Sequence, residues 1–234
     1  MQRSAKVALV ASVVVLVAGA AGFWWFVLRD DAPERAGLPV RTGDSAPAGS
    51  TPDSAISPDG TWTVVAGEEV FAGYRIQELF GGETVKKTAV GRTPAVTGTM
   101  EIVDGTVTSV QITADLTSLT SDSERRDATQ RTQGLQTDQF PEARFVLTEP
   151  ISLGQAPPPG APITVSATGE LTLHGVTRPV TLELQASWTG TVVDVAGGAP
   201  ITLAEFGIEP PRTPFVSVDD VGEFEVQLSF ERTG

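Results

Sequence analysis

From Trp62 onward, hydrophobic and polar residues alternate in short runs. Because successive side chains of a β-strand point to opposite faces, this alternation predicts strands with one buried face. The hydrophobic positions of these runs are Val96, Gly98, Met100 and Ile102; Val110, Ile112, Ala114 and Leu116; Phe145 and Leu147; Val165, Ala167, Gly169, Leu171 and Leu173; Val180, Leu182, Leu184, Ala186 and Trp188; and Phe224, Val226, Leu228 and Phe230. Further strands are expected near Trp62–Ala66, Tyr74–Leu79 and Ile201–Ile208. About eight runs separated by Gly, Pro and Asp favour an all-β fold, either an antiparallel barrel or a sandwich.

One short helix is predicted to interrupt the strands. Ser121 and Glu124 have the spacing of a capping box, in which each side chain bonds to the other residue's free backbone N–H. Gly134 can adopt the left-handed conformation that ends a helix. The connector that follows carries Leu135 and Phe140, which we expect to cap one end of the barrel.

The single histidine, His174, lies between two predicted strands. Gly175 permits a positive φ, and Pro179 can begin the next strand because a first residue need not donate to the ladder. This arrangement predicts a hairpin whose turn is stabilised by the imidazole. A catalytic histidine is the alternative, but a lone histidine lacks the partners that a relay or a metal site requires.

The N-terminus has a different pattern, an uncharged hydrophobic run from Val7 to Leu28. As a helix this run would extend roughly 33 Å, which is enough to cross a bilayer. Basic residues precede it and acidic residues follow it, so the positive-inside rule places the N-terminus in the cytoplasm and the remainder outside. The alternative is a cleaved signal peptide, with Val7–Val17 as its apolar core and Ala18–Ala20 as the cleavage site, which would leave a secreted or periplasmic protein.

The next stretch, residues 29–57, is rich in Pro, Gly, Ser, Ala and Asp and has no hydrophobic periodicity. This composition predicts a disordered or extended tether. We therefore divide the chain into a membrane anchor or signal segment (1–28), a tether (29–57) and a β-barrel domain (58–234).

Composition and charge narrow the possible partners. The formal net charge of −13 argues against nucleic acid, because no basic face can be assembled to displace counterions from phosphates. The chain contains no cysteine, which excludes disulfides, thiolate metal sites and cysteine nucleophiles. No acidic group has the spacing of a calcium loop. We therefore expect neither a metal nor a cofactor.

Two separated motifs resemble the YceI-like family of lipocalin-like lipid-binding proteins. Gly169–Leu184, which reads GELTLHGVTRPVTLEL, is similar to the signature hairpin of that family. Arg126-Asp127, followed by QFPEARF at Gln139–Phe145, is similar to its Arg-Asp element and later Phe-Pro pattern. The resemblance extends approximately from Trp62 to Phe230.

This resemblance implies an eight-stranded antiparallel barrel with a helix near one end. It also implies an elongated apolar ligand in the interior, such as a polyisoprenoid, an isoprenoid quinone or a fatty amide. Family members often carry histidines and a His-Ser pair near the first strands, whereas the matching Gly67–Tyr74 reads GEEVFAGY here. Headgroup contacts made by those residues therefore cannot be transferred to this chain.

Candidate ligand-binding residues are of three kinds. Small side chains at Ala167 and Gly169 would leave volume on an inward face, or would instead mark a corner where glycine lets the strand bend. Arg126 can contact a polar headgroup at the barrel mouth, or can join Asp127 in clamping the helix to a strand end. Arg92, in a Gly-rich loop, is a rival headgroup contact. The aromatic candidates for lining the bore, for which ordinary core packing is the alternative, are Phe71, Tyr74, Phe80, Phe140, Phe145, Trp188 and Phe206.

Taken together, these features predict an exported, non-enzymatic, membrane-tethered protein that holds a long-chain amphiphilic lipid for transport, storage or a stress role. Its partners would be that lipid and the cytoplasmic membrane, and the sequence is compatible with a homodimer. One alternative is a hydrolase or transferase acting on such lipids, although the chain has no Gly-x-Ser-x-Gly elbow. The other alternative is a surface interaction module with a filled barrel.

Overall fold

The computed structural model describes residues 32–39, 57–80, 85–154, 158–210 and 216–233. Its strands and helices, with η marking a 3₁₀ helix, are β1 (Gly60–Val64), β2 (Phe71–Phe80), β3 (Val85–Thr93), β4 (Val96–Val103), β5 (Thr106–Asp115), η1 (Leu116–Ser118), β6 (Thr120–Ser121), α2 (Glu124–Thr132), β7 (Glu142–Leu147), β8 (Ile151–Ser152), β9 (Ile163–Leu173), β10 (Val176–Trp188), β11 (Val192–Thr202), η2 (Leu203–Phe206), β12 (Val216–Val218) and β13 (Val221–Arg232).

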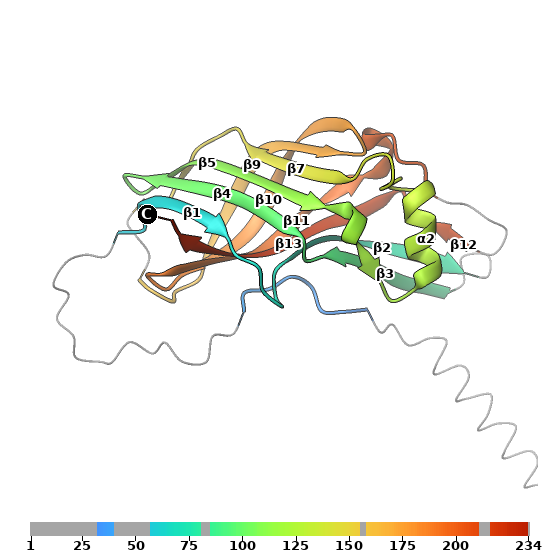
Figure 1. Cartoon of the computed structure of the whole chain (residues 1–234), viewed down its shortest axis with the longest axis horizontal. Coiled ribbons are helices and arrows are strands. Elements are labelled where there is room, and N and C mark those ends of the chain that lie inside the picture. Colours follow the sequence, from blue (N-terminus) through green and yellow to red (C-terminus); the bar gives the residue numbers. More distant parts are fainter. Residues whose placement is uncertain (1–31, 40–56, 81–84, 155–157, 211–215, 234) are drawn as a thin grey trace, which may run out of the picture.

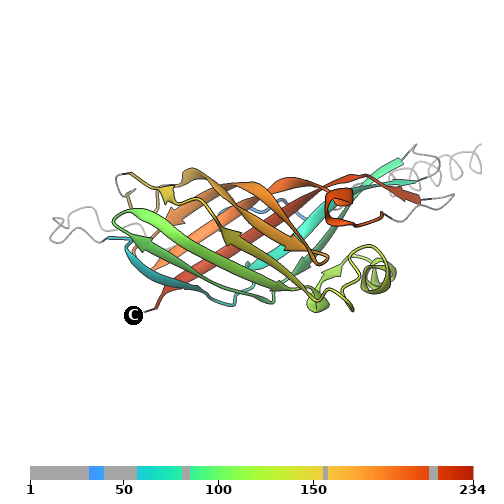
Figure 2. The ribbon, with the colours of Figure 1, turned by 90° about the horizontal axis from the view of Figure 1, so that it is seen from above.

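Eight antiparallel strands close into a barrel in the order β1-β4-β5-β7-β9-β10-β11-β13. The barrel closes where Phe230 of β13 pairs with Val64 of β1. Earlier along β13, Gln227 pairs with Phe71 of β2. Strand β13 therefore pairs first with β2 and then, nearer its end, with β1. The β2–β3 hairpin extends the wall toward the end that carries α2 (Figures 1 and 2). The expected all-β, eight-stranded antiparallel barrel is therefore confirmed, and the sandwich is not formed.

The predicted alternation places its hydrophobic positions inside the barrel. Leu171 of β9, Leu182 of β10 and Phe230 of β13 are each at most 3% exposed. The buried residues form two clusters, one around Trp62 and the other around η1, η2 and the end of β9. Phe224 packs against both clusters, which places it where the two halves of the core meet.

Helix α2 begins two residues later than predicted from the capping box at Ser121. Ser123, and not Ser121, caps α2, and its hydroxyl accepts a hydrogen bond from the Arg126 N–H at 3.4 Å. Ser121 is held in β6 by pairing with Gly91, so its backbone cannot serve as the first turn of a helix. The predicted stop is confirmed, because Gly134 has a φ of +57°.

One strand prediction and one loop prediction also need correction. The expected strand Ile201–Ile208 ends at Thr202 and continues as the 3₁₀ helix η2, whose Leu203 and Phe206, three residues apart, both turn into the core. Arg92 lies in strand β3 and not in a loop, because Gly91 provides the room that Tyr74 needs on the neighbouring strand. A Cβ added at Gly91 would lie 2.5 Å from the Tyr74 ring.

Residues 32–39, which belong to the predicted tether, form neither helix nor strand and lie against the outer wall formed by β2, β3 and β13 (blue in Figure 1). In the part of the chain that the structure describes, no helix is both long and apolar enough to cross a membrane. The predicted span Val7–Leu28 lies outside the described residues.

Candidate functional site

The barrel contains two cavities that follow one another along β13. The larger has a volume of about 730 Å³, lies beside α2 and reaches β13 at Gly222–Phe224. The smaller has a volume of about 110 Å³ and is lined along β13 from Phe224 to Phe230. The larger volume falls within the range of about 300–1,000 Å³ that is typical of small-molecule sites.

The smaller cavity is apolar. Apart from Ser187, every residue that lines it has a hydrophobic side chain. Three of the predicted ligand-binding residues line it, namely Phe145, Ala167 and Trp188, and each of them is at most 5% exposed. Such a cavity stabilises hydrocarbon and not water, because water would find almost no hydrogen-bonding partner there.

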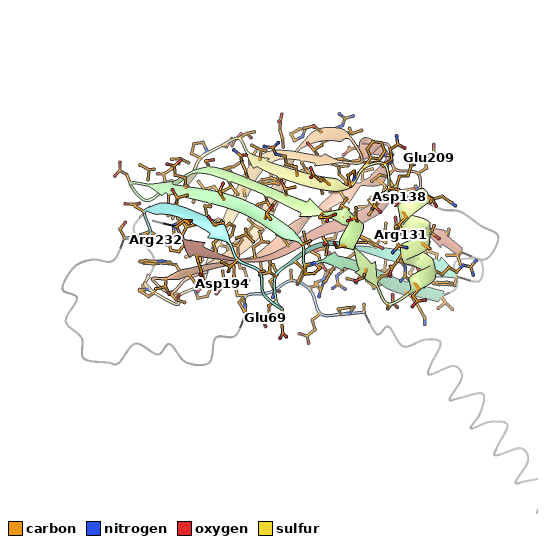
Figure 3. The ribbon with its side chains drawn as sticks, in the orientation of Figure 1. Glu69, Arg131, Asp138, Asp194, Glu209 and Arg232 are labelled. Atoms are coloured by element: carbon orange, nitrogen blue, oxygen red, sulfur yellow. The ribbon has the colours of Figure 1, made fainter. Side chains whose placement is uncertain are left out.

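The larger cavity has a mixed lining and reaches the surface. Hydrophobic side chains from β2, η1, η2 and β12 form much of its wall, and the predicted residues Tyr74, Phe80 and Arg126 also line it. Arg125 and Gln133 line it from the α2 side, and both are exposed to solvent. The cavity therefore opens beside α2, at the end of the barrel where Figure 3 labels Arg131 and Asp138; Arg232 lies at the opposite end.

Phe224 lies at the boundary between the two cavities. It is the only residue that lines both of them among those that the structure describes. Its backbone neighbours across the sheet are Tyr74 of β2 and Ala199 of β11, which places its ring on the inner face. Sequence alternation predicts that Phe224 points inward, but it contains no sign that the ring divides the bore.

The hydroxyl group of Tyr74 is buried in the wall of the larger cavity and has no hydrogen-bond partner within the described residues. Gln130 lies nearby, but it makes no hydrogen bond with the phenol; its Oε1 accepts one from the Leu135 N–H at 3.0 Å. Burial raises the pKa of Tyr74 well above its ordinary value, so the phenol keeps its proton at neutral pH. Tyr74 therefore offers an unused hydrogen-bond donor to whatever occupies the cavity.

Arg126 clamps α2 to β2. Its Nε and Nη2 donate to the two carboxylate oxygens of Glu78, both at 2.8 Å, and its Nη1 also bonds to Asp122. Hydrogen bonding to Glu78 raises the pKa of the guanidinium further. Asp127 is satisfied separately, because it accepts hydrogen bonds from the backbone N–H of Ser121 at 3.0 Å and from its hydroxyl at 2.6 Å. The geometry thus fits the clamp interpretation, and Arg126 reaches the cavity with its charge already paired.

Gly169 differs from its neighbour Ala167, because it does not leave open volume in the bore. A Cβ at this position would lie 2.6 Å from the tip of the Phe145 ring and 2.3 Å from the Val146 carbonyl oxygen. The missing side chain is therefore filled by the ring from β7. The structure therefore does not show the open space expected at Gly169. The close approach of the β7 strand is a third reason for a glycine here, beside the open volume and the strand bend that the sequence left open.

Phe71 and Arg92 lie on the outside of the barrel. The Arg92 guanidinium stacks on the Phe71 ring, 3.9 Å from its centroid, and Arg92 Nε donates to Glu225 at 2.8 Å. Neither residue lines either cavity. The structure therefore does not bring these two candidates to the interior.

His174 lies in the predicted β9–β10 hairpin. His174 and Gly175 both have positive φ, +53° and +73°, as a two-residue type I′ turn requires. Because the Phe206 carbonyl can only accept, His174 Nδ1 carries the hydrogen in their 3.2 Å bond. The imidazole also packs against Phe140, with ring centroids 4.3 Å apart. Phe140 and Phe206 thus join the hairpin to η2 and do not line the cavities.

We expect His174→Asn to lower the free energy of unfolding by about 1 kcal/mol, because asparagine accepts the left-handed backbone but loses the bond to Phe206. His174→Ala should cost about 2 kcal/mol, because it adds backbone strain at positive φ. Urea denaturation of both variants measures this difference. A variant as stable as the parent would contradict the structural role of the imidazole.

The remaining site features were not visible in the sequence. The sequence offers no sign of Glu78 as a site residue, because its partner Arg126 is 48 residues away in the chain. The outward charge Glu225 carried no signal either, since its position in the alternation is that of an exposed residue. In the described parts of the chain, no group of three or more His, Cys, Asp or Glu residues is arranged to hold a metal.

A closed antiparallel barrel with an apolar interior that opens beside a helix is the architecture of barrels large enough to hold one small ligand. The YceI-like domain model matches residues 63–230, and the chain therefore belongs to the YceI-like family.

Curated relatives match part of the chain. A UPF0312 protein of Pseudomonas savastanoi pv. phaseolicola is 33% identical over 98 residues, which cover 39% of this chain and 44% of the relative. A UPF0312 protein of Vibrio parahaemolyticus is 31% identical over 106 residues, covering 42% of this chain and 52% of the relative. The matched region thus spans about half the length of these relatives.

Solved structures share the fold. A polyisoprenoid binding domain from Saccharophagus degradans, implicated in plant cell wall breakdown, superposes with a TM-score of 0.56 at 15% identity, covering 74% of this chain and 98% of that one. BcnA of Burkholderia cenocepacia gives a TM-score of 0.50 at 19% identity, covering 67% and 95%. At these identities the similarity establishes the architecture only.

Proposed function

We propose that this protein binds a long-chain amphiphilic lipid, with its hydrocarbon inside the barrel and its polar group beside Tyr74. The observation that carries the proposal is an apolar cavity that adjoins, at Phe224, a larger cavity with an opening lined partly by polar groups. A polyisoprenoid or an isoprenoid quinone has the required shape. The fold shared with a polyisoprenoid binding domain supports this choice of ligand.

One orphaned polar group supports an amphiphile over a pure hydrocarbon. The Tyr74 hydroxyl, in the wall of the larger cavity, is buried and has no partner among the described residues. Buried polar groups are usually satisfied, so this hydroxyl is a place where a ligand's oxygen would gain a hydrogen bond. Binding and not catalysis is proposed, because the sole histidine is engaged in a turn and its Nε2 faces no partner in the described structure.

The proposed setting is the outer face of the cytoplasmic membrane. The hydrophobic run Val7–Leu28 would anchor the chain there, and a cleaved form would be secreted or periplasmic. Transport, storage and a stress role are all compatible with a barrel that holds lipid near its source.

Native mass spectrometry of the full chain, followed by organic extraction, tests the proposal. We expect a mass increment that solvent removes and that long-chain probes restore. Ala167→Leu, which fills the smaller cavity, should reduce the increment, whereas Thr164→Leu, on the outer face of the same strand, should not. A chain without extractable lipid and without affinity for long-chain probes would rule the function out.

Phe224→Leu should shift ligand preference toward longer chains, because it opens the passage between the cavities. Each further CH₂ buried in the smaller cavity is worth about 0.8 kcal/mol, or roughly fourfold in affinity. Competition between saturated fatty amides of increasing length measures the shift. Ile76→Val, which changes only the larger cavity, is the matched control. Unchanged length preference in Phe224→Leu would contradict the gating role of the ring.

A further inference from the structure

A buried cluster of charges lies on the outer wall of the barrel. Glu225 occupies an outward position on β13, yet it is only 2% exposed. Arg92 Nε bonds to it at 2.8 Å, and Arg75 Nε lies 3.5 Å from it. Arg75 is itself only 8% exposed. Outward charges of a barrel are normally solvated, so something covers this cluster.

The cover is the segment of residues 32–39, which we call the strap. The backbone carbonyls of Pro33 and Glu34 accept hydrogen bonds from Arg75 Nη2 at 2.7 and 3.0 Å. Arg92 Nη2 also donates to the Glu34 carbonyl. Because a guanidinium donates in these bonds, they belong to the stronger, charge-assisted class. The strap is therefore bound through its backbone by two arginines of the wall.

The strap runs in a defined direction along β13. Arg35 pairs with Glu223, the Ala36 N–H donates to Glu225 at 3.4 Å, and the Gly37 N–H donates to Gln227 at 3.1 Å. Glu223 lines the larger cavity, whereas residues farther along β13 line the smaller one. The strap therefore runs from beside the larger cavity toward the smaller one, below the wall in Figure 1.

The start of the strap is close in sequence to the predicted membrane span. Only residues 29–31 separate Leu28 from Ala32, so the two Cα atoms are at most about 14 Å apart. A tether free over residues 29–57 would reach about 100 Å when fully extended. The bound strap removes most of that freedom at the end of the barrel where the cavity opens.

We propose that the strap holds the barrel with its larger cavity facing the membrane, so that lipid passes between bilayer and barrel over a short path. This inference rests on the proposed function and on an uncleaved anchor. A net charge of −13 would otherwise drive the domain away from anionic headgroups. The partner surface is thus the lipid bilayer itself. The strap keeps the barrel oriented beside that surface, although the net charge of the chain would repel it from anionic headgroups.

Energy transfer from the barrel to the membrane tests the orientation. The chain has no cysteine, so a single one can be labelled at either end. Arg125→Cys places a donor at the end where the larger cavity opens, and Val103→Cys, 44% exposed, places it at the opposite end. The full chain is reconstituted into phosphatidylcholine vesicles that contain an acceptor lipid. Strand length and tilt put the two ends about 30 Å apart, so we expect severalfold more transfer from position 125.

Two matched insertions identify the strap as the cause. A twenty-residue Gly-Ser linker between Asp31 and Ala32 should abolish the difference between the two labels, because it frees the bound strap from the span. The same linker between Pro39 and Val40 should leave the difference intact, since it lies after the strap. Equal transfer from both labels in the parent chain, equal effects of the two insertions, or loss of the chain from the vesicles on flotation would each overturn the proposal.

The outcome is separable from that of the proposed function. Lipid binding is read by mass spectrometry, whereas orientation is read by energy transfer and needs no bound ligand. A correctly oriented barrel that carries no lipid would remove the function and keep the strap's role. A barrel that binds lipid but is randomly oriented would do the reverse.

Discussion

Glu225→Gln is expected to lower the free energy of unfolding by about 3 kcal/mol. The substitution keeps the size of the side chain but leaves Arg75 and Arg92 without the carboxylate that both face. Breaking a buried ion pair from one side typically costs about 3–5 kcal/mol, and the partial exposure of Arg92 places this case at the lower end. Urea denaturation followed by circular dichroism measures the change.

Glu223→Gln is the control for this result. Glu223 lies two residues earlier on the same face and pairs with Arg35, but both side chains are accessible to water. An exposed pair contributes about 0–1 kcal/mol, so little stability should be lost. If the two substitutions cost the same, the cluster around Glu225 would not be the buried, strap-covered site that the structure describes.

Gly169→Val is expected to cost about 3 kcal/mol or more, although valine is the better strand former. Its side chain would collide with the Phe145 ring and with a backbone carbonyl of β7, and overpacking of this kind costs about 1–3 kcal/mol or occasionally more. Strand propensity alone predicts the opposite sign. Thermal denaturation therefore distinguishes a close approach between strands from an ordinary strand position.

Gly67→Ala is the comparison for the glycine substitution. A Cβ at Gly67 would meet only a Val70 methyl group at 3.7 Å, which is ordinary contact. The variant should be as stable as the parent or slightly more so, because alanine restricts the unfolded chain. A tolerated valine at position 169 would mean that the space beside Phe145 is open after all.

The local alternation of hydrophobic and polar residues was sufficient to predict the inward-facing residues of strands that bury one continuous face. The alternation in β4, β9, β10 and β13 placed their inward residues correctly. When alternate residues are hydrophobic and one face of the strand is buried, only one of the two faces can point inward. The alternation failed for β11 and β3. In β11, Asp194, Gly197 and Gly198 interrupt the alternation, and in β3 Lys86 and Arg92 resemble loop residues. These strands are specified by neighbours distant in sequence.

The candidate site was predicted in part. Phe145, Ala167, Trp188, Tyr74, Phe80 and Arg126 line the two cavities. Phe71 and Arg92 lie outside, because an aromatic or an arginine in a strand has no local mark of which face is covered. Arg92 bonds to the strap on the outer face and its guanidinium covers the Phe71 ring, so Phe71 is buried and Arg92 partly buried, although both lie outside the barrel.

The sequence by itself determined the class of fold, the inward faces of most strands and the hairpin turn at His174, because each depends on residues near one another in the chain. The tertiary structure decided which glycines are open and which are filled, that Phe224 lies between the two cavities, and that the outward Glu225 is buried. Those properties arise where segments meet that are separated by tens to hundreds of residues. Local periodicity cannot predict these long-range contacts, because they are stabilised only when the whole barrel has closed.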